Sequence, residues 1–382
     1  IEAALAARCP DADRPEPTDR PDLSDTEFET VFCADGFLFP RGAAFARASF
    51  SRGANFARAS FSGRAVFERA TFSGAAIFDG TTFSGYAGFA RATFSDLAIF
   101  EDASFSGLGI FERVSFSSLA AFARASFSDV ANFRSASFSI GAAFWSASFF
   151  GDATDFSDAS FEAATSFAPD KYPVAPDPPR PTRFAAPPKF FNATLHEDTD
   201  WTDVVWPDPP KDRDEAIAYR RAYERLKLVM AEQNKFADEH FFLRRELECR
   251  EIAEPGTLST LASRAFRVLS GYGWSIARPL RAIGIAWAAG AFALFAIEVW
   301  DYRHGAWPDP ETTPPEFLGP GQAMGLSFSN LFAFLGLGWH IMRDELSSLT
   351  AVSEIVAAAQ MFAGPVLLFL LAPGLRNRFR IK

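Results

Sequence analysis

Residue types that commonly do chemistry are few and scattered in this chain of 382 residues. The histidines and cysteines are His196, His240, His304, His340, Cys9, Cys33 and Cys249. Their spacing does not match a metal site, and three distant cysteines do not indicate a disulfide framework. The chain also has no nucleophile or nucleotide-binding motif. We therefore expect a protein that is not an enzyme, has no metal or cofactor, and resides in a reducing compartment.

Arginine recurs regularly in the first half of the chain. Arg47, Arg69, Arg91 and Arg113 lie 22 residues apart, and Arg58 and Arg124 lie half an interval away. One interpretation is a solvated face of a regular structure. The other is a docking stripe for an acidic protein partner or for lipid headgroups.

The arginines belong to a phenylalanine repeat that runs from Phe45 to Phe167. Its steps alternate five and six residues up to Phe149, where one extra residue, Phe150, enters. A small side chain stands two positions before nearly every phenylalanine. The predicted core begins with Phe45, Phe50, Phe56, Phe61, Phe67, Phe72, Phe78, Phe83, Phe89, Phe94, Phe100 and Phe105.

This spacing favours short strands over a helix. Steps of five and six place no single stripe on an α-helix, and the frequent glycines and serines would destabilise one. In a strand, residues two positions apart point to the same side, so each small residue and its phenylalanine face inward together. Such a repeat predicts a solenoid in which neighbouring coils complete each other's core.

The small-x-Phe pattern resembles the pentapeptide-repeat proteins, in a variant with alternating steps of five and six. The resemblance implies a right-handed, quadrilateral β-helix with 22 residues per coil. We expect a disordered tail over 1–27, the β-helix over 28–206, and a proline-rich insertion over 168–189 that leaves the coils. Phe28, Cys33 and Phe39 are expected to form an irregular first coil, and Trp201 to close the last one.

Residues 207–278 read as an amphipathic helical linker. Tyr219, Tyr223, Leu226 and Met230 follow helical spacing, which predicts one helix over 211–254 that packs on the solenoid or mediates oligomerisation. A second amphipathic helix over 257–276, with basic residues on its polar side, would suit a membrane surface.

The remaining residues, 279–382, predict a two-span membrane module. Spans are expected at about 279–300 and 355–375, with a hinge at Gly364 and Pro365 in the second. Basic residues flank both outer ends, whereas the segment 298–354 carries eight acids and two arginines. This predicts two cytoplasmic termini, an even number of crossings, and a segment at about 324–339 that is re-entrant or lies on the outer surface.

Two spans around a re-entrant segment resemble the pore module of two-transmembrane potassium channels. Leu335, Gly336, Leu337, Gly338 and Trp339 stand where that family has its Thr-Val-Gly-Tyr-Gly filter, whose carbonyls replace the ion's hydration shell. The chain keeps Gly-x-Gly but lacks the Thr and the Tyr. A filter at this depth implies a homo-oligomer and monovalent ions, whereas the alternative is a plain loop packed between helices.

The runs Tyr272-Gly273-Trp274-Ser275 and Arg376-Asn377-Arg378-Phe379-Arg380 also resemble bacterial membrane pentapeptide-repeat proteins, which implies the inner membrane. The leading hypothesis is a channel-like pore with a cytoplasmic β-helix as sensor or docking domain. The alternative is a non-conducting, membrane-anchored scaffold that binds a protein. A DNA mimic that inhibits a topoisomerase is disfavoured, because residues 41–167 hold ten arginines and eleven acids. We therefore expect no nucleic-acid partner.

Overall fold

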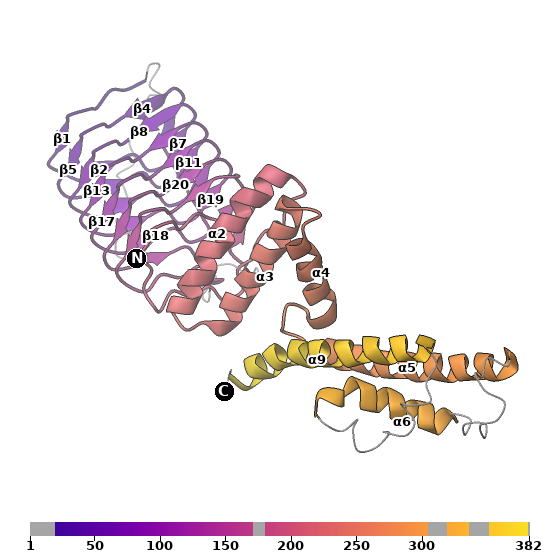
Figure 1. Ribbon diagram of the computed structural model, residues 1–382. Coiled ribbons are helices and arrows are strands. Elements are labelled where there is room, and N and C mark those ends of the chain that lie inside the picture. Colours follow the sequence, from indigo (N-terminus) through magenta and orange to yellow (C-terminus); the bar gives the residue numbers. More distant parts are fainter. Residues whose placement is uncertain (1–19, 171–179, 305–318, 336–350, 381–382) are drawn as a thin grey trace. The chain divides into compact units, whose positions relative to one another are not determined.

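The computed structural model describes residues 20–170, 180–304, 319–335 and 351–380. Two compact units divide the chain at residues 253 and 254. The first unit is a β-solenoid closed at one end by helices α2 and α3, and the second is a group of helices (Figure 1). The predicted β-solenoid of stacked, four-sided coils is confirmed, because its parallel strands form four separate sheets.

From β4 to β23, each coil contributes one short strand to each sheet, in the chain order A, B, C, D. Sheet A contains β4 (Gly42–Ala44), β8 (Arg64–Val66), β12 (Ala87–Gly88), β16 (Gly109–Ile110), β20 (Ala131–Asn132) and β24 (Thr154–Asp155). Sheet B contains β1 (Glu27–Phe28), β5 (Ser49–Phe50), β9 (Thr71–Phe72), β13 (Thr93–Phe94), β17 (Ser115–Phe116), β21 (Ser137–Phe138) and β25 (Ser160–Phe161).

The other two sheets complete the square. Sheet C contains β2 (Phe32–Cys33), β6 (Ala54–Asn55), β10 (Ala76–Ile77), β14 (Ala98–Ile99), β18 (Ala120–Ala121) and β22 (Ala142–Ala143). Sheet D contains β3 (Leu38–Phe39), β7 (Ser60–Phe61), β11 (Thr82–Phe83), β15 (Ser104–Phe105), β19 (Ser126–Phe127), β23 (Ser148–Phe149) and β26 (Arg183–Phe184). Register fixes the coil at 22 residues, since Ala76 pairs with Ala98 and Ala98 with Ala120.

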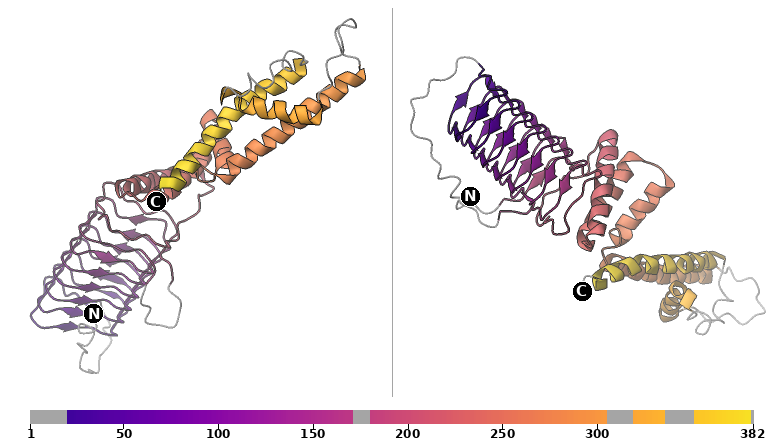
Figure 2. Two further views of the ribbon diagram at one scale, coloured as in Figure 1. Left: turned by 90° about the horizontal axis from the view of Figure 1, so that it is seen from below. Right: turned by 90° about the vertical axis from the view of Figure 1, so that its left-hand side faces the viewer.

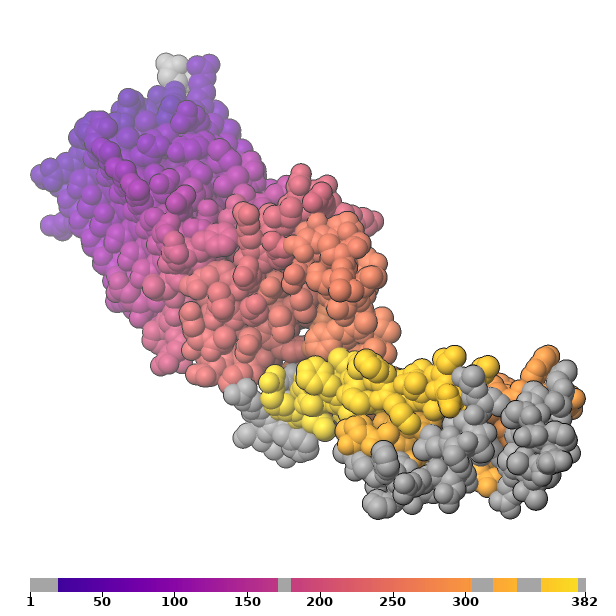
Figure 3. Space-filling view, viewed as in Figure 1, coloured from indigo at the N-terminus to yellow at the C-terminus, as the bar shows by residue number. Residues whose placement is uncertain are grey.

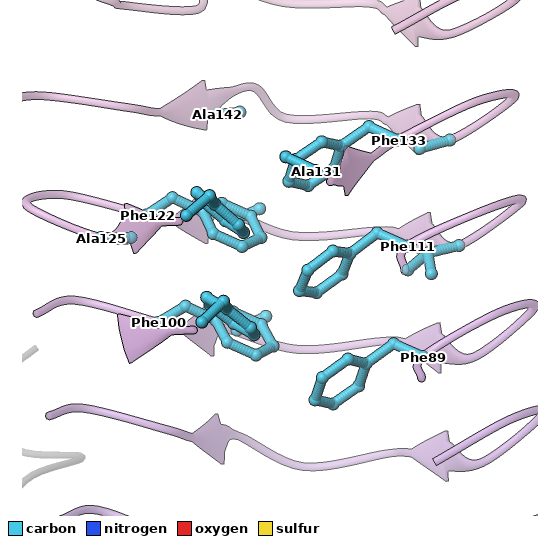
Figure 4. Close-up of a cluster of buried hydrophobic side chains, with 14 of the residues drawn as sticks. Phe89, Phe100, Phe111, Phe122, Ala125, Ala131, Phe133 and Ala142 are labelled. Atoms are coloured by element: carbon cyan, nitrogen blue, oxygen red, sulfur yellow. The ribbon is translucent and has the colours of Figure 1, made fainter. Parts of the chain in front are cut away.

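Phenylalanine rings fill the interior and stack along the solenoid axis. Phe89, Phe111 and Phe133 form one stack, beside a second that contains Phe100 and Phe122 (Figure 4). Ring centroids within a stack lie 4.8 to 4.9 Å apart, close to the strand spacing of ~4.8 Å, so the rings follow the backbone rise. Neighbouring stacks meet edge to face, as aromatic quadrupoles favour. The twelve phenylalanines from Phe45 to Phe105 are fully buried.

The first coil departs from the predicted ladder by one residue. Cys33 pairs with Asn55, so Ala34 and not Cys33 takes the inward position that Phe56 holds one coil later. Phe32 stands at the small-residue position and packs against the core. The large and the small side chain have exchanged places, which keeps the volume at this corner filled.

The later coils absorb two insertions. The extra residue after Phe149 shifts the register to 23, since Ala131 pairs with Thr154, and Phe150 is exposed. The predicted insertion 168–189 is shorter in the structure, because Arg183–Phe184 forms β26 and Phe184 stacks on Phe149. Trp201 stacks on Phe167 in the last coil, with ring centroids 4.4 Å apart.

Two helices close this end of the solenoid: α2 (Arg213–Glu232) and α3 (Phe236–Ala253). The prediction of one helix over 211–254 is wrong, because the chain reverses at Asn234, whose φ is positive, and α3 packs against α2. Arg225 of α2 donates to the carbonyls of Phe190 and Ala193, at 3.2 and 3.1 Å. Main-chain acceptors of the terminal coil are thereby satisfied, which protects an otherwise open β edge.

The second unit contains α4 (Leu258–Ser270), α5 (Ala277–His304), α6 (Pro320–Leu331), the short 3₁₀ helix η1 (Ala333–Leu335) and α9 (Ala351–Arg380). Both views in Figure 2 show α5 and α9 side by side. Their segments Ala277–Asp301 and Val352–Arg376 are long and apolar enough to cross a membrane. Figure 3 shows α6 against α9 in the same unit.

Candidate functional site

The polar centre of the second unit lies where α6 meets α5 and α9. Helices α5 and α9 run antiparallel, since Gln360 reaches the carbonyl of Ala286 while Gly374 lies beside Ile276. The contacts of α6 fall near the middle of both apolar segments. With 12 residues, α6 is about 18 Å long, which is shorter than the ~30 Å hydrocarbon core of a bilayer.

A connected set of hydrogen bonds joins the three helices. The Ser327 hydroxyl donates to the carbonyl of Trp287 at 2.7 Å and accepts from Gln360 Nε2 at 2.7 Å. Gln360 Nε2 also lies 3.2 Å from the carbonyl of Ala286, and Asn330 Nδ2 donates to Gln360 Oε1 at 3.4 Å. Ser327, Asn330 and Gln360 are all buried. We call these three side chains the polar network.

Two glycines permit the close approach of the helices. A Cβ at Gly290 would lie 1.8 Å from Gln360 Nε2 and 2.8 Å from Ser327 Oγ. A Cβ at Gly364 would lie 1.8 Å from the carbonyl oxygen of Leu331, at the end of α6. Helix–helix contact through small residues is the usual way in which membrane helices pack closely.

The hinge and the filter were predicted in this region. The structure describes α9 as one helix through Gly364 and Pro365, and it gives Gly364 a packing contact; the hinge itself stays a prediction. The backbone of Leu335 ends η1, directly after the end of α6. Gly336, Leu337, Gly338 and Trp339 lie outside the described residues, so the filter also stays a prediction.

The arginines of the predicted docking stripe divide between two opposite corners of the solenoid. Arg47, Arg69, Arg91 and Arg113 follow sheet A and precede sheet B, whereas Arg58 and Arg124 lie between sheets C and D. They therefore do not form one stripe. All six have a positive φ, between 56° and 59°.

The positive φ identifies these positions as the third residue of a tight turn. Ala48 N–H donates to the carbonyl of Phe45 at 3.1 Å, which closes the turn that contains Arg47. A left-handed third residue is typical of a type II turn, where glycine or asparagine is usual. Gly36, Gly80 and Asp102 occupy the same position in other coils, and that recurrence in the sequence could have revealed the turn.

Carboxylates within the solenoid compensate four of the six arginines. Arg47 pairs with Asp25 one coil earlier, Arg58 with Asp35, and Arg113 with Glu112 at 3.8 Å. Arg124 contacts three carboxylates, those of Asp102, Asp170 and Glu101, at 2.9, 2.7 and 3.3 Å.

Two acids near Arg124 have pKa values above their ordinary values. Burial raises the pKa of Glu101 despite the attraction of Arg124, and burial likewise raises the pKa of Asp79. Hydrogen bonding to Asp102 raises the pKa of the Arg124 guanidinium. The C–D corner is therefore an internally satisfied ion cluster, whereas Arg69 and Arg91 at the A–B corner are exposed.

The described residues offer neither a metal-binding cluster nor a reactive free thiol. Within those ranges no group of three His, Cys, Asp or Glu side chains could hold a metal ion. The spacing of the cysteines did not indicate a disulfide framework, but the structure has Cys33 in a disulfide bond. Cys249 is free and buried, and burial raises the pKa of its thiol to about 12, which makes it unreactive.

Sequence reasoning missed the polar network. Its signal is present in the printed sequence, since Ser327 and Asn330 lie three residues apart on one helix and Gln360 interrupts the apolar run of α9. Polar residues inside membrane-length segments usually face other helices.

Compared with protein families, with curated proteins and with solved structures, the chain matches none.

Proposed function

We propose that the chain is a membrane-anchored pentapeptide-repeat protein whose C-terminal unit assembles in several copies into an ion-conducting pore. The observation that carries this proposal is the placement of α6. Its first half packs with Leu294 through Ala323 and Leu326, whereas its last residue, Leu331, lies at Gly364. Gly364 is in the middle of the apolar segment Val352–Arg376.

A short helix that ends at mid-depth supports a re-entrant segment. Residues 335–339 begin at the end of η1, which comes shortly after α6, so they would begin near the centre of the bilayer. Non-helical backbone at that depth is tolerated only where it is buried in protein or lines a water-filled cavity. One pair of spans cannot enclose such a segment on all sides, which favours a homo-oligomer. Carbonyls of Leu335 to Trp339 would then line the pore and contact monovalent ions.

The outer surface of the unit favours the membrane environment. Large apolar side chains such as Phe292, Phe362 and Phe369 are exposed on α5 and α9. Helix α4 exposes Leu258, Leu261 and Val268 along one face, as an interfacial helix does. These surfaces would contact lipid tails and the headgroup boundary.

The charge distribution supports a bacterial inner-membrane location with both termini in the cytoplasm. The disulfide at Cys33 argues for the opposite side, since disulfides persist in oxidising compartments. Labelling of Arg52→Cys, an exposed solenoid position, with a membrane-impermeant maleimide decides between them. The positive-inside assignment requires labelling only after permeabilisation, and labelling of intact cells or spheroplasts would reverse it.

The pore is tested by ion flux from liposomes that contain the full-length protein. We expect flux of K⁺ or Na⁺ that is lost in Gly336→Ala and Gly338→Ala. The matched control is Gly284→Ala in α5, where an added Cβ meets nothing within 4 Å. Absence of flux for K⁺, Na⁺ and Cl⁻, from protein shown to be inserted and folded, would remove the pore.

A non-conducting scaffold is the second candidate function. It is favoured by the polar network, whose side chains bond to each other and to Trp287 and Ala286 within one chain. A module closed in this way serves as an anchor, and the solenoid would then bind a protein partner. Exposed Arg69 and Arg91 offer a basic edge for that purpose.

A further inference from the structure

The second unit separates its charges between the two ends of its apolar helices. Arg278 and Arg281 lie about one turn apart at the start of the segment Ala277–Asp301, and Arg376 is the last residue of Val352–Arg376. Because α5 and α9 run antiparallel, these three arginines come to the same end of the helix pair. All three are exposed. We call them the arginine corner.

The acids of this unit lie far from the corner. Its described residues include four, which are Glu254, Glu298, Asp301 and Glu354. Along the helix axis, Glu298 and Asp301 lie about 26 and 30 Å beyond Arg281, because each residue adds 1.5 Å. Glu354 lies about 33 Å from Arg376, and Glu254 precedes the start of α4, a helix about 20 Å long. These separations exceed the Debye length of about 10 Å, so the four acids do not compensate the corner.

Contacts among three helices hold the corner in place. The guanidinium of Arg278 donates to the carbonyl of Arg267, in the last turn of α4, at 3.0 Å. A Cβ on Gly374 of α9 would lie 3.2 Å from Ile276. The turn between α4 and α5 therefore packs against α9 only two residues before Arg376, and the three arginines lie on a fixed framework.

Exposed apolar side chains accompany the arginines. Leu280 precedes Arg281, Leu375 precedes Arg376, and Val268 and Trp274 are exposed on α4 and on the turn after it. A free phosphate ion would neutralise the arginines but leave these side chains in contact with water. An anionic phospholipid supplies both partners, since its phosphate meets the guanidinium groups and its acyl chains meet the apolar surface. Tryptophan is also enriched at the headgroup level of a bilayer.

We propose that the arginine corner binds the headgroup of an anionic phospholipid whose acyl chains lie along α5 and α9. The inference rests on the proposed membrane anchoring but not on the pore, and it holds for either orientation of the chain. Arginine suits this ligand because its planar guanidinium donates two parallel hydrogen bonds to a phosphate group. A lipid bound here would join the turn between α4 and α5 to the end of α9, and would fix the ends of both spans at the membrane surface.

Competition between two lipids tests the proposal. The full-length protein is purified in detergent micelles that contain equal amounts of phosphatidylglycerol and phosphatidylcholine with identical acyl chains. Native mass spectrometry then reports which lipid is retained. We expect about tenfold more phosphatidylglycerol than phosphatidylcholine. Arg281→Gln combined with Arg376→Gln should bring this ratio close to one, because each basic residue near an anionic lipid strengthens binding several-fold.

Arg303→Gln is the matched control, since Arg303 is an exposed arginine at the opposite end of α5. It should leave the lipid ratio unchanged. Arg281→Lys combined with Arg376→Lys keeps the charge and should retain most of the preference, which separates loss of charge from a folding defect. A ratio near one in the unaltered protein would overturn the proposal, and so would an equal loss of preference in Arg303→Gln.

Two further measurements separate a lipid site from its alternatives. Excess glycerol phosphate offers the same phosphate group without acyl chains, so it should not displace phosphatidylglycerol. Displacement would show that the corner recognises phosphate alone and would overturn the lipid site. Flotation of reconstituted liposomes after alkaline extraction tests the anchoring by itself. Protein that does not float would remove the proposed membrane function, whereas protein that floats but retains both lipids equally would overturn this inference alone.

Discussion

The two units of this chain bury opposite kinds of side chain. The solenoid buries phenylalanine and exposes serine, threonine and charge, so that Phe100 is inaccessible while the turns face water. The helical unit buries Ser327, Asn330 and Gln360 and exposes Phe362 over 81% of its surface. Such an inversion is expected if one unit is solvated by water and the other by lipid.

Different interactions determine how the parts of each unit fit together. In the solenoid, each ring finds the same neighbours one coil away, so repetition alone sets the register. The helical unit has no repeat, and apolar contact does not distinguish a neighbouring helix from a lipid tail. Glycine contacts and directed hydrogen bonds must therefore define how α5, α6 and α9 fit together.

The largest effect is expected from breaking a phenylalanine stack. Phe100→Ala removes a fully buried ring that stacks on Phe78 and Phe122. The loss of buried surface and the cavity should cost about 3 to 5 kcal/mol of unfolding free energy. Urea unfolding followed by far-UV circular dichroism measures it. Phe150→Ala is the control, because Phe150 is 56% exposed, and a similar loss there would contradict the inward ladder.

A glycine contact should dominate the stability of the helical unit. Gly364→Ala places a Cβ against the Leu331 carbonyl, so α6 must shift, at a cost of about 1 to 3 kcal/mol. Thermal unfolding of the detergent-solubilised protein provides the measurement. Gly284→Ala adds the same methyl group where the space is open and should be neutral or slightly stabilising. Equal effects of both substitutions would disprove close packing at Gly364.

Much of the solenoid could be predicted from the sequence, because the spacing of the sequence repeat equals the residue offset between paired strands. Steps of five and six fix the four sides, the 22-residue coil and the inward phenylalanines. The ends could not be predicted, because there the repeat is broken. Ala34 and Phe32 exchange sizes in the first coil, and β26 returns to the ladder from within the proline-rich stretch.

The candidate site was less predictable for a physical reason. Composition reveals that two segments are long and apolar enough to cross a membrane, but not which polar atoms meet between them. Ser327 and Gln360 are 33 residues apart and connect only once α6 packs against α9. The turn arginines were misread as one stripe because charge is visible in a sequence and a positive φ is not.

Loss of the polar network should lower the stability of the helical unit by an intermediate amount. Gln360→Leu keeps the size of the side chain but removes its bonds to Ser327, Asn330 and Ala286. Interhelical hydrogen bonds in membranes contribute about 0.6 kcal/mol on average and up to about 1.7. We expect a loss in this range by thermal unfolding in detergent. Exposed Met361→Leu is the control, and a stabilised Gln360→Leu would show that the network does not hold the helices together.

Replacement of a turn arginine should increase the stability of the solenoid. Arg69 has a φ of 58°, a conformation that asparagine tolerates better than arginine. Arg69→Asn should raise the unfolding free energy by up to about 1 kcal/mol, whereas Arg52→Asn, at a position without a positive φ, should not. Urea unfolding of both variants decides. The same pair tests docking, since loss of partner binding in Arg69→Asn alone would assign Arg69 to an interface.

The smallest effect concerns the pH dependence of the C–D corner. Burial raises the pKa of Glu101 above its ordinary value of 4.5. The folded state therefore holds this proton more tightly than the unfolded state, and the stability it contributes is lost as pH rises through the folded pKa. Glu101→Gln removes that contribution, so its unfolding free energy relative to wild type should rise from pH 4 to pH 7. A difference for Glu101→Gln that falls with rising pH would mean that attraction to Arg124 outweighs burial, and the corner would then be a net stabilising ion cluster.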